Sequence, residues 1–219
     1  MRHILGRTMP LFHLSKKVRE MRRVFTAIHD ARSWGSSESV SGPGSTRERA
    51  QTFLPDLVAL VRRLDVGTLL DVPCGDFNWA APVADAVDQY IGVDVVPALI
   101  AANRRNWTTK SRRFLCLDMV TERLPAADLV LCRDGLVHLS HNDALAALEN
   151  LRRTGARYFI FTTFIGDRSN ADIPNGNWRP LNMEGPPFAL PPPIELIDEH
   201  CDHTGGIYRD KRLGLWGRI

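Results

Sequence analysis

The stretch Thr68-Leu-Leu-Asp-Val-Pro-Cys-Gly-Asp-Phe-Asn-Trp79 decides the fold of this chain. A short apolar run ends at the acid Asp71, and a tight segment with Pro73 and Gly75 follows it. Polar residues that can cap a helix then precede an Ala-rich run. This order predicts a strand, a sharp turn and a helix start, where backbone N–H groups face a ligand. Gly75 would permit a close approach that a side chain blocks.

Apolar strands alternate with helical runs from this strand onward, and the pattern predicts a parallel sheet covered by helices on both faces. The expected strands are 68–72, 89–95, 113–117, 127–132 and 158–162, and the expected helices are 79–87, 97–106 and 141–153. Two further apolar segments, 194–200 and 213–219, could form an antiparallel pair at the end of the chain.

Acidic residues recur where the predicted strands end. Asp71, Asp94 and Asp118 follow one another at intervals of about 23 residues, and the pair Arg133-Asp134 ends the fourth strand. Ligands of open parallel sheets bind beyond the carboxyl ends of the strands. The recurrence therefore predicts one site built along this edge of the sheet.

The deciding stretch resembles motif I of the class I S-adenosylmethionine-dependent methyltransferases, whose usual form is Asp/Glu-x-Gly-x-Gly-x-Gly. Asp71 and Gly75 match this form, whereas Pro73 and Phe77 stand where the first and third glycines usually lie. An ordinary strand-to-helix turn is the alternative for this stretch alone. Two observations favour the methyltransferase interpretation over a nicotinamide dinucleotide site. Gly-x-Gly-x-x-Gly does not follow the first strand, and the acid Asp118 has no role in a dinucleotide site.

Further segments, at 41–45, 71–79, 131–140 and 176–182, resemble a largely uncharacterised bacterial set of these methyltransferases. The resemblance covers most of residues 34–219. It implies a Rossmann-like, doubly wound α/β fold with a seven-stranded sheet, mostly parallel with an antiparallel C-terminal strand. It also implies S-adenosyl-L-methionine as cofactor, and it leaves the substrate open.

The resemblance assigns nine residues to the cofactor: Asp71, Pro73, Cys74, Gly75, Asp94, Val95, Asp118, Met119 and Arg133. Asp71 would lie near the methionine part, and Asp94 would accept hydrogen bonds from the ribose hydroxyls, which suit a carboxylate. Asp118 would read the adenine amino group while Met119 packs on the ring.

Two residues after the fourth strand are the catalytic candidates. Methyl transfer is an in-line displacement that needs positioning and, for a hydroxyl acceptor, a base. His138 has an ordinary pKa near neutrality and could take the hydroxyl proton, with Asp134 orienting it or holding the substrate. A structural histidine and a capping acid are the alternative interpretation.

The segment 164–192 lacks periodicity, and a loop of this length is typical of a functional lid or of a misread element. Its substrate-binding candidates are Asp172, Trp178, Arg179 and Asn182. An aromatic ring, a guanidinium and an amide suit a sugar or another polar small molecule, including an anionic one. A loop pinned to the core by Trp178 would explain the same residues.

We divide the chain into an N-terminal helical cap with a Ser/Gly loop, 1–66, and a methyltransferase domain, 67–219. An apolar stripe over 11–28 predicts a helix, and residues 1–24 carry a net charge of +6 against +3 for the whole chain. A packed helix with a solvated basic face is the favoured interpretation. The alternatives are a cover over the active site, a dimer contact or an RNA-facing arm. The Ser/Gly loop 34–46 could close over a cofactor or link two helices.

Composition limits the protein class. The 219 residues are 44% hydrophobic and 24% charged, which is ordinary for a globular protein. The four cysteines lack C-x-x-C spacing and the histidines lack ligand spacing, so we expect no metal site. Neither a membrane span nor a signal peptide is indicated, and we expect a cytoplasmic protein.

The leading functional hypothesis is a methyltransferase that acts on a polar small molecule or saccharide, at oxygen. An RNA or protein methyltransferase is the second hypothesis. The Asn/Asp-Pro-Pro-Tyr motif of many amino-group methyltransferases is absent, and Arg133–Leu136 stands in its place, so nucleic acid is not favoured. A non-catalytic cofactor-binding or partner-binding module is the third. Both a monomer and a homodimer are compatible with the sequence.

Overall fold

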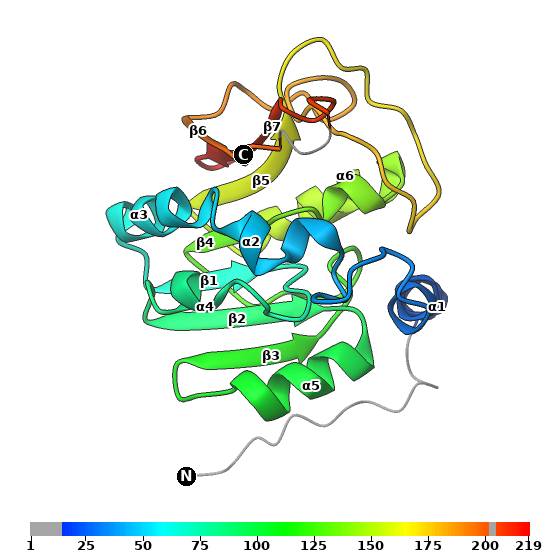
Figure 1. Cartoon of the computed structure of the whole chain (residues 1–219), viewed down its shortest axis with the longest axis vertical. Helices are drawn as coiled ribbons and strands as arrows, with labels where there is room; N and C mark the ends of the chain where they lie inside the picture. The colour runs from blue at the N-terminus through cyan, green and yellow to red at the C-terminus, as the bar shows by residue number, and fades with distance from the viewer. Residues whose placement is uncertain (1–14, 202–204) are drawn as a thin grey trace.

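A seven-stranded sheet forms the centre of the computed structural model, which describes residues 15–201 and 205–219 (Figure 1). The strand order is β3-β2-β1-β4-β5-β7-β6. The first five strands in this order pair in parallel, and β7 is antiparallel to both β5 and β6. The strands are β1 Thr68–Asp71, β2 Gln89–Asp94, β3 Arg112–Cys116, β4 Leu129–Cys132, β5 Tyr158–Phe164, β6 Glu195–Asp198 and β7 Lys211–Trp216. This order confirms the Rossmann-like, doubly wound α/β prediction.

Six α-helices surround the described sheet. They are α1 Lys16–Asp30, α2 Arg47–Ala50, α3 Leu54–Leu64, α4 Ala81–Ala84, α5 Pro97–Trp107 and α6 His141–Arg152. The short 3-10 helices η2 Pro43–Ser45 and η3 Leu136–His138 flank the site described below. The helix predicted at 79–87 is a single turn, because the loop after β1 extends to residue 80 and Pro82 lies in the first turn of α4.

The two faces of the sheet are covered by different helices. On one face α1 and α6 contribute to a core that contains Met21 and Leu148, and on the other α3, α4 and α5 pack around Leu57 and Ile100. The strands β4 and β5 are buried along nearly their whole length, as expected for a central parallel sheet. No helix in the described ranges is long and apolar enough to cross a membrane.

The apolar stripe of the N-terminal helix is used for packing. Ser15 caps α1 by accepting a hydrogen bond from the Val18 backbone N–H, and Val18 and Met21 are buried. Leu11 and Leu14, the first members of the predicted stripe, lie outside the described residues. In Figure 1, α1 lies beyond the end of the sheet to which the arrowheads of β1, β2 and β3 point.

Two residues with strained backbone lie at this same end of the sheet. Phe77 and Asp134 are non-glycine residues with φ of 58° and 53°, in the turns that follow β1 and β4. Such left-handed conformations cost free energy and cluster at ligand sites. The strained turns after β1 and β4 therefore agree with a functional site at the carboxyl edge of these strands.

Candidate active site

A pocket of about 1000 Å³, including its open mouth, lies at the carboxyl edge of the sheet. Its floor comes from the turns after β1, β2, β3 and β4. Its cover comes from α1, through Met21, Phe25 and His29, and from the loop 34–45. Both N-terminal elements thus cover the pocket. For the basic helix, a cover over the site was one of the alternatives to the favoured interpretation of a packed helix with a solvated face.

The turn after β1 explains why position 75 is glycine. Gly75 has a φ of 54°, and a Cβ added there would lie 2.2 Å from the Ser41 Oγ. Its N–H donates to the Asp94 Oδ2 at 3.3 Å, and its carbonyl accepts from the Asn103 side chain at 2.7 Å. The turn is therefore fixed between the end of β2, α5 and the covering loop.

Two buried carboxylates line the floor. Asp94 is 8% exposed and accepts from the backbone N–H of Val96 at 3.0 Å as well as from Gly75. Asp118 accepts from the Val120 N–H and the Thr121 hydroxyl at 2.9 and 2.7 Å. Burial raises the pKa of both carboxyls, and these hydrogen bonds oppose the shift. Both groups are held in place with acceptor capacity remaining.

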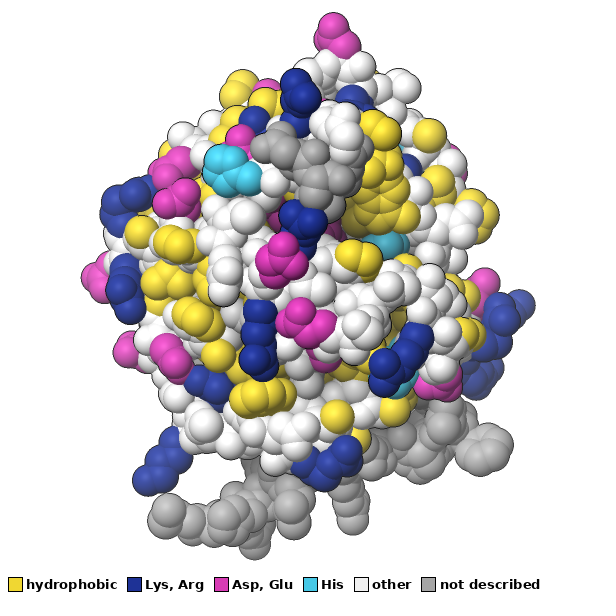
Figure 2. Space-filling view, in the orientation of Figure 1, with side chains coloured by type: hydrophobic (Ala, Val, Ile, Leu, Met, Phe, Trp, Pro, Cys, Tyr) yellow, Lys and Arg dark blue, Asp and Glu magenta, His cyan; other side chains and the backbone are white. Residues whose placement is uncertain are grey.

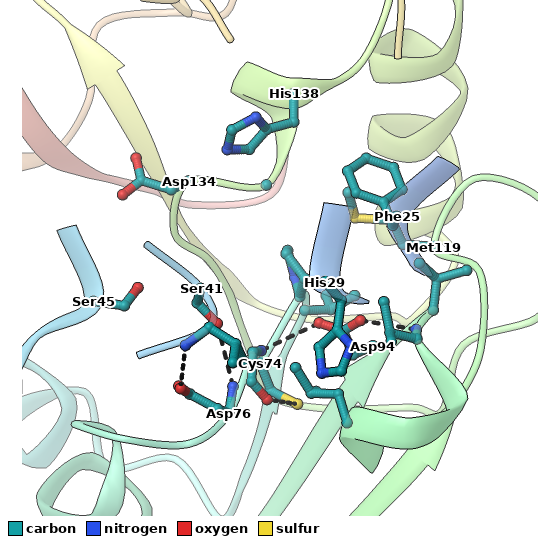
Figure 3. A pocket seen from close by; sticks show the side chains of 18 of the residues that line it. Phe25, His29, Ser41, Ser45, Cys74, Asp76, Asp94, Met119, Asp134 and His138 are labelled. Atoms are coloured by element: carbon teal, nitrogen blue, oxygen red, sulfur yellow. Dashed lines mark hydrogen bonds between the residues drawn. The ribbon is translucent and has the colours of Figure 1, made fainter. Parts of the chain in front are cut away.

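An apolar slot lies beside these acids. Val95 and Met119 follow β2 and β3, and Figure 3 shows Phe25 of α1 next to Met119. His29, from the last turn of α1, lies close to Asp94 in the same view. A flat ring with hydroxyl groups at one end fits a slot with an acid at its rim.

Asp71 is the one predicted cofactor residue that does not line the pocket, although the other eight do. It is 2% exposed and accepts a hydrogen bond from the Tyr90 hydroxyl at 2.5 Å. Burial raises the pKa of Asp71 to about 7, while Tyr90 and the charge of Arg133 oppose the shift. Asp71 thus lies beneath the turn and supports it rather than facing a ligand.

Arg133 lines the pocket, but its charge is already paired. Its Nε and Nη2 donate to the Glu199 Oε2 at 3.1 and 2.5 Å, and Nη2 also donates to the Gly44 carbonyl at 2.9 Å. The guanidinium lies 4.5 Å from the Phe53 ring centroid and 5.3 Å from that of Trp79. Arg133 therefore ties the end of β4 to the residue after β6 and to the covering loop.

Asp134 faces the pocket as a carboxylate. Its Oδ2 accepts from the Lys211 Nζ at 2.7 Å, and its Oδ1 accepts from the Thr162 hydroxyl at 3.3 Å. Burial alone would raise its pKa, but the charges of Lys211 and Arg133 outweigh burial and hold the pKa of Asp134 well below its ordinary value. A carboxylate of this kind binds and orients a donor but is a poor base.

His138 has a defined tautomer. Its Nδ1 lies 2.9 Å from the Asn177 carbonyl oxygen, and because a carbonyl only accepts, Nδ1 carries the hydrogen. In the neutral ring the lone pair is then on Nε2. Burial lowers the pKa of His138, although the Asn177 bond and Asp134 oppose this, and the shift favours the neutral ring. Figure 3 shows Asp134 and His138 at one end of the pocket, away from Asp94.

The four predicted substrate residues Asp172, Trp178, Arg179 and Asn182 are not among the residues that line the described pocket. They hold the 164–192 loop together. Arg179 donates to the Val137 carbonyl at 3.1 Å, and Trp178 packs against Phe164 with 6.0 Å between ring centroids. The alternative interpretation, a loop pinned to the core, describes their contacts.

Sequence reasoning did not single out Trp34, which lines the pocket, or Lys211, which pairs with a lining residue. Trp34 stacks on His138 with ring centroids 4.7 Å apart, and Lys211 pairs with Asp134 from the last strand. The Trp-Gly-Ser composition of the covering loop was a usable signal for Trp34. No local pattern pointed to Lys211. No group of three metal-ligating side chains is present in the described ranges.

Comparisons with known proteins were consistent with this geometry. Residues 69–156 match a family model described as a methyltransferase domain. The [4+2]-cyclase SpnF is similar in structure, with a TM-score of 0.57, 19% identity, and coverage of 92% of this chain and 94% of that one. Magnesium protoporphyrin IX methyltransferase from Synechocystis PCC 6803 with bound SAM has a TM-score of 0.53 and 15% identity, with 73% and 82% covered. No curated protein matches the sequence.

The matched segment contains the turn after β1 and both floor acids, Asp94 and Asp118. The protein is an enzyme with a class I methyltransferase domain, and its cofactor is S-adenosyl-L-methionine. The pocket fits this cofactor. Gly75 leaves room at the turn, Asp94 offers a carboxylate to ribose hydroxyls, and Asp118 and Met119 flank the apolar slot for adenine. The acids also suit a ligand that carries ammonium and sulfonium charges.

Proposed function

We propose that the enzyme methylates an oxygen atom of a polar small molecule, with a saccharide as the favoured class. Bound S-adenosylmethionine supplies an electrophilic methyl group. His138 takes the acceptor hydroxyl proton on Nε2, and Asp134 orients that hydroxyl or a neighbouring one. The neutral, directional imidazole at the acceptor end of the pocket is the observation that carries this proposal.

The charges around the pocket favour an acceptor that is neutral or cationic. Asp76, Asp94, Asp118 and Asp134 line it, and the guanidinium of Arg133 is paired with Glu199. At the acceptor end Asp134 is paired with Lys211, and Arg133, the one Lys or Arg among the described lining residues, is also paired, so a phosphate or carboxylate would find no unpaired Lys or Arg in that lining. Sugars with free hydroxyl or amino groups are therefore better candidates than sugar phosphates.

The contacts of α1 support a small acceptor over RNA. Figure 2 shows Lys and Arg side chains on the outer side of the region where α1 lies. However, Lys17 pairs with Asp143 at 2.7 Å, and Arg22 lies 3.5 Å from Glu122. The opposite face of the helix covers the pocket. These basic residues thus help to hold a cover in place, although an RNA or protein acceptor remains the second candidate.

A turnover screen tests the proposal. The full chain is incubated with S-adenosylmethionine and with neutral glycosides, amino sugars, sugar phosphates, transfer RNA or peptides, and S-adenosylhomocysteine formation is measured. We expect turnover with a neutral or amino sugar, and its loss in His138→Gln. Turnover only with RNA or peptide would replace the small-molecule acceptor. Absence of cofactor binding in calorimetry would favour a non-catalytic module.

A further inference from the structure

The base candidate is held by two segments that lie outside the matched methyltransferase segment, 69–156. The Asn177 carbonyl accepts a hydrogen bond from Nδ1 of His138, and Trp34 stacks on one face of that ring. The two rings are inclined by only 28°, with 4.7 Å between their centroids. One contact fixes the edge of the imidazole, and the other restricts rotation out of its plane.

Trp34 is itself fixed from behind. Gly42 has a φ of 95°, and a Cβ added there would lie 3.2 Å from the Trp34 Cβ, so the loop backbone passes close to the base of the Trp34 side chain. The same loop is joined to the cofactor turn, because the Val40 N–H donates to the Asp76 Oδ2 at 3.0 Å. The Asp76 N–H in turn donates to the Ser41 Oγ at 3.3 Å.

We infer that Trp34 is a positioning residue that keeps Nε2 of His138 turned toward the pocket as the proton acceptor. This inference rests on the proposed role of His138 as base. An imidazole without the stack could turn about its side-chain bonds and lose the Asn177 bond. The Nε2–H tautomer would then be populated, and this form has no lone pair on the atom that must take the proton. The covering loop would thus couple cofactor binding to the orientation and tautomer of His138.

The test measures the tautomer directly. The full chain is labelled with 15N-histidine, and long-range 15N–1H correlation spectra are recorded at about pH 8, where neutral rings dominate. The His138 signals are those missing from His138→Gln. We expect an Nδ1–H ring in the wild type and in Trp34→Phe, which keeps an aromatic stack. Trp34→Ala should show a mixture rich in Nε2–H.

Matched variants separate positioning from general damage. Asn177→Ala keeps the backbone carbonyl and should keep the wild-type tautomer. Trp34→Leu fills the same apolar space without a ring and provides the result if Trp34→Ala does not fold. The other histidine signals and the thermal midpoint report the integrity of the fold. An unchanged Nδ1–H ring in a folded Trp34→Ala or Trp34→Leu would overturn the inference.

Kinetics distinguish this inference from the proposed function. With an acceptor in hand, Trp34→Ala should lower kcat by at least about tenfold, and Trp34→Phe by less than about threefold. The tautomer measurement needs no acceptor. If His138→Gln keeps full turnover, the proposed function fails while the tautomer result stands. If the Trp34 variants keep the wild-type tautomer, the inference about Trp34 fails even when turnover shows that His138 is the base.

Discussion

Replacing Asp71 by asparagine tests the energetic cost of the buried acid beneath the cofactor turn. The carboxyl is 2% exposed, and burial raises its pKa from 3.8 to about 7 in the folded protein. In the unfolded chain it ionises near pH 4. The folded state therefore holds a proton that the unfolded state has lost, and stability falls as the pH rises from about 4 to about 7.

The size of the effect follows from this difference of about three pKa units, which corresponds to about 4 kcal/mol at 1.36 kcal/mol per unit. Between pH 5 and pH 8, about two of these units are crossed, or about 3 kcal/mol. Asparagine keeps an oxygen that can accept from the Tyr90 hydroxyl, and it does not ionise. Between pH 5 and pH 8, the free energy of unfolding of Asp71→Asn should therefore rise by about 3 kcal/mol relative to that of the wild type.

Urea unfolding followed by tryptophan fluorescence at pH 5, 6, 7 and 8 measures this difference. Other titrating groups are common to both proteins and cancel in the comparison. Tyr90→Phe is the matched variant, because it removes the hydrogen bond that lowers the pKa of Asp71 and should extend the loss of stability to higher pH. A stability difference between Asp71→Asn and wild type that is the same at pH 5 and pH 8 would refute the assignment.

Three further outcomes are expected. Asp94→Ala should weaken S-adenosylhomocysteine binding by about 10- to 100-fold in calorimetry, because it removes a buried carboxylate acceptor. His138→Ala should lower kcat by about 10²- to 10⁴-fold with little change in cofactor affinity. In the wild type, kcat/KM should rise with pH to a plateau through the lowered pKa of His138, since the base must be neutral. Gly75→Ala should cost about 1–3 kcal/mol of stability and weaken cofactor binding, because of the Ser41 contact and the left-handed backbone.

Each of these outcomes has a clear opposite. Cofactor affinity that survives Asp94→Ala would remove this acid from the ribose site. A kcat/KM that falls with rising pH below neutrality would mean that His138 acts as an acid or not at all. Gly155→Ala is the control for Gly75→Ala, because Gly155 also has a positive φ, of 77°, but has open space around it. Equal losses of cofactor affinity in these two variants would show that contact with Ser41 is not the cause.

Local patterns in the sequence determined the sheet and the floor of the site. Alternation of apolar strands with helices is a property of neighbouring residues, and it predicted the five parallel strands to within a few residues. Two apolar segments near the end of the chain predicted the antiparallel pair β6 and β7. Parallel strands place their carboxyl ends at one edge, so strand order along the chain was enough to bring the acids after β2 and β3 together. Asp71 was the exception. Like Asp94 it is the last residue of its strand, but its carboxyl accepts a hydrogen bond from the Tyr90 hydroxyl of β2 and does not line the pocket.

Tertiary packing decided the cover and the acceptor end of the pocket. The apolar stripe of α1 is the same whether the helix packs on the domain or closes a pocket, and only its position brings Phe25 and His29 to the ligand. Lys211 lies 77 residues from Asp134 in the chain, and Trp34, from the covering loop, stacks on His138 beyond the fourth strand. Periodicity reports which face of an element is buried, but it carries no information about which distant element that face meets.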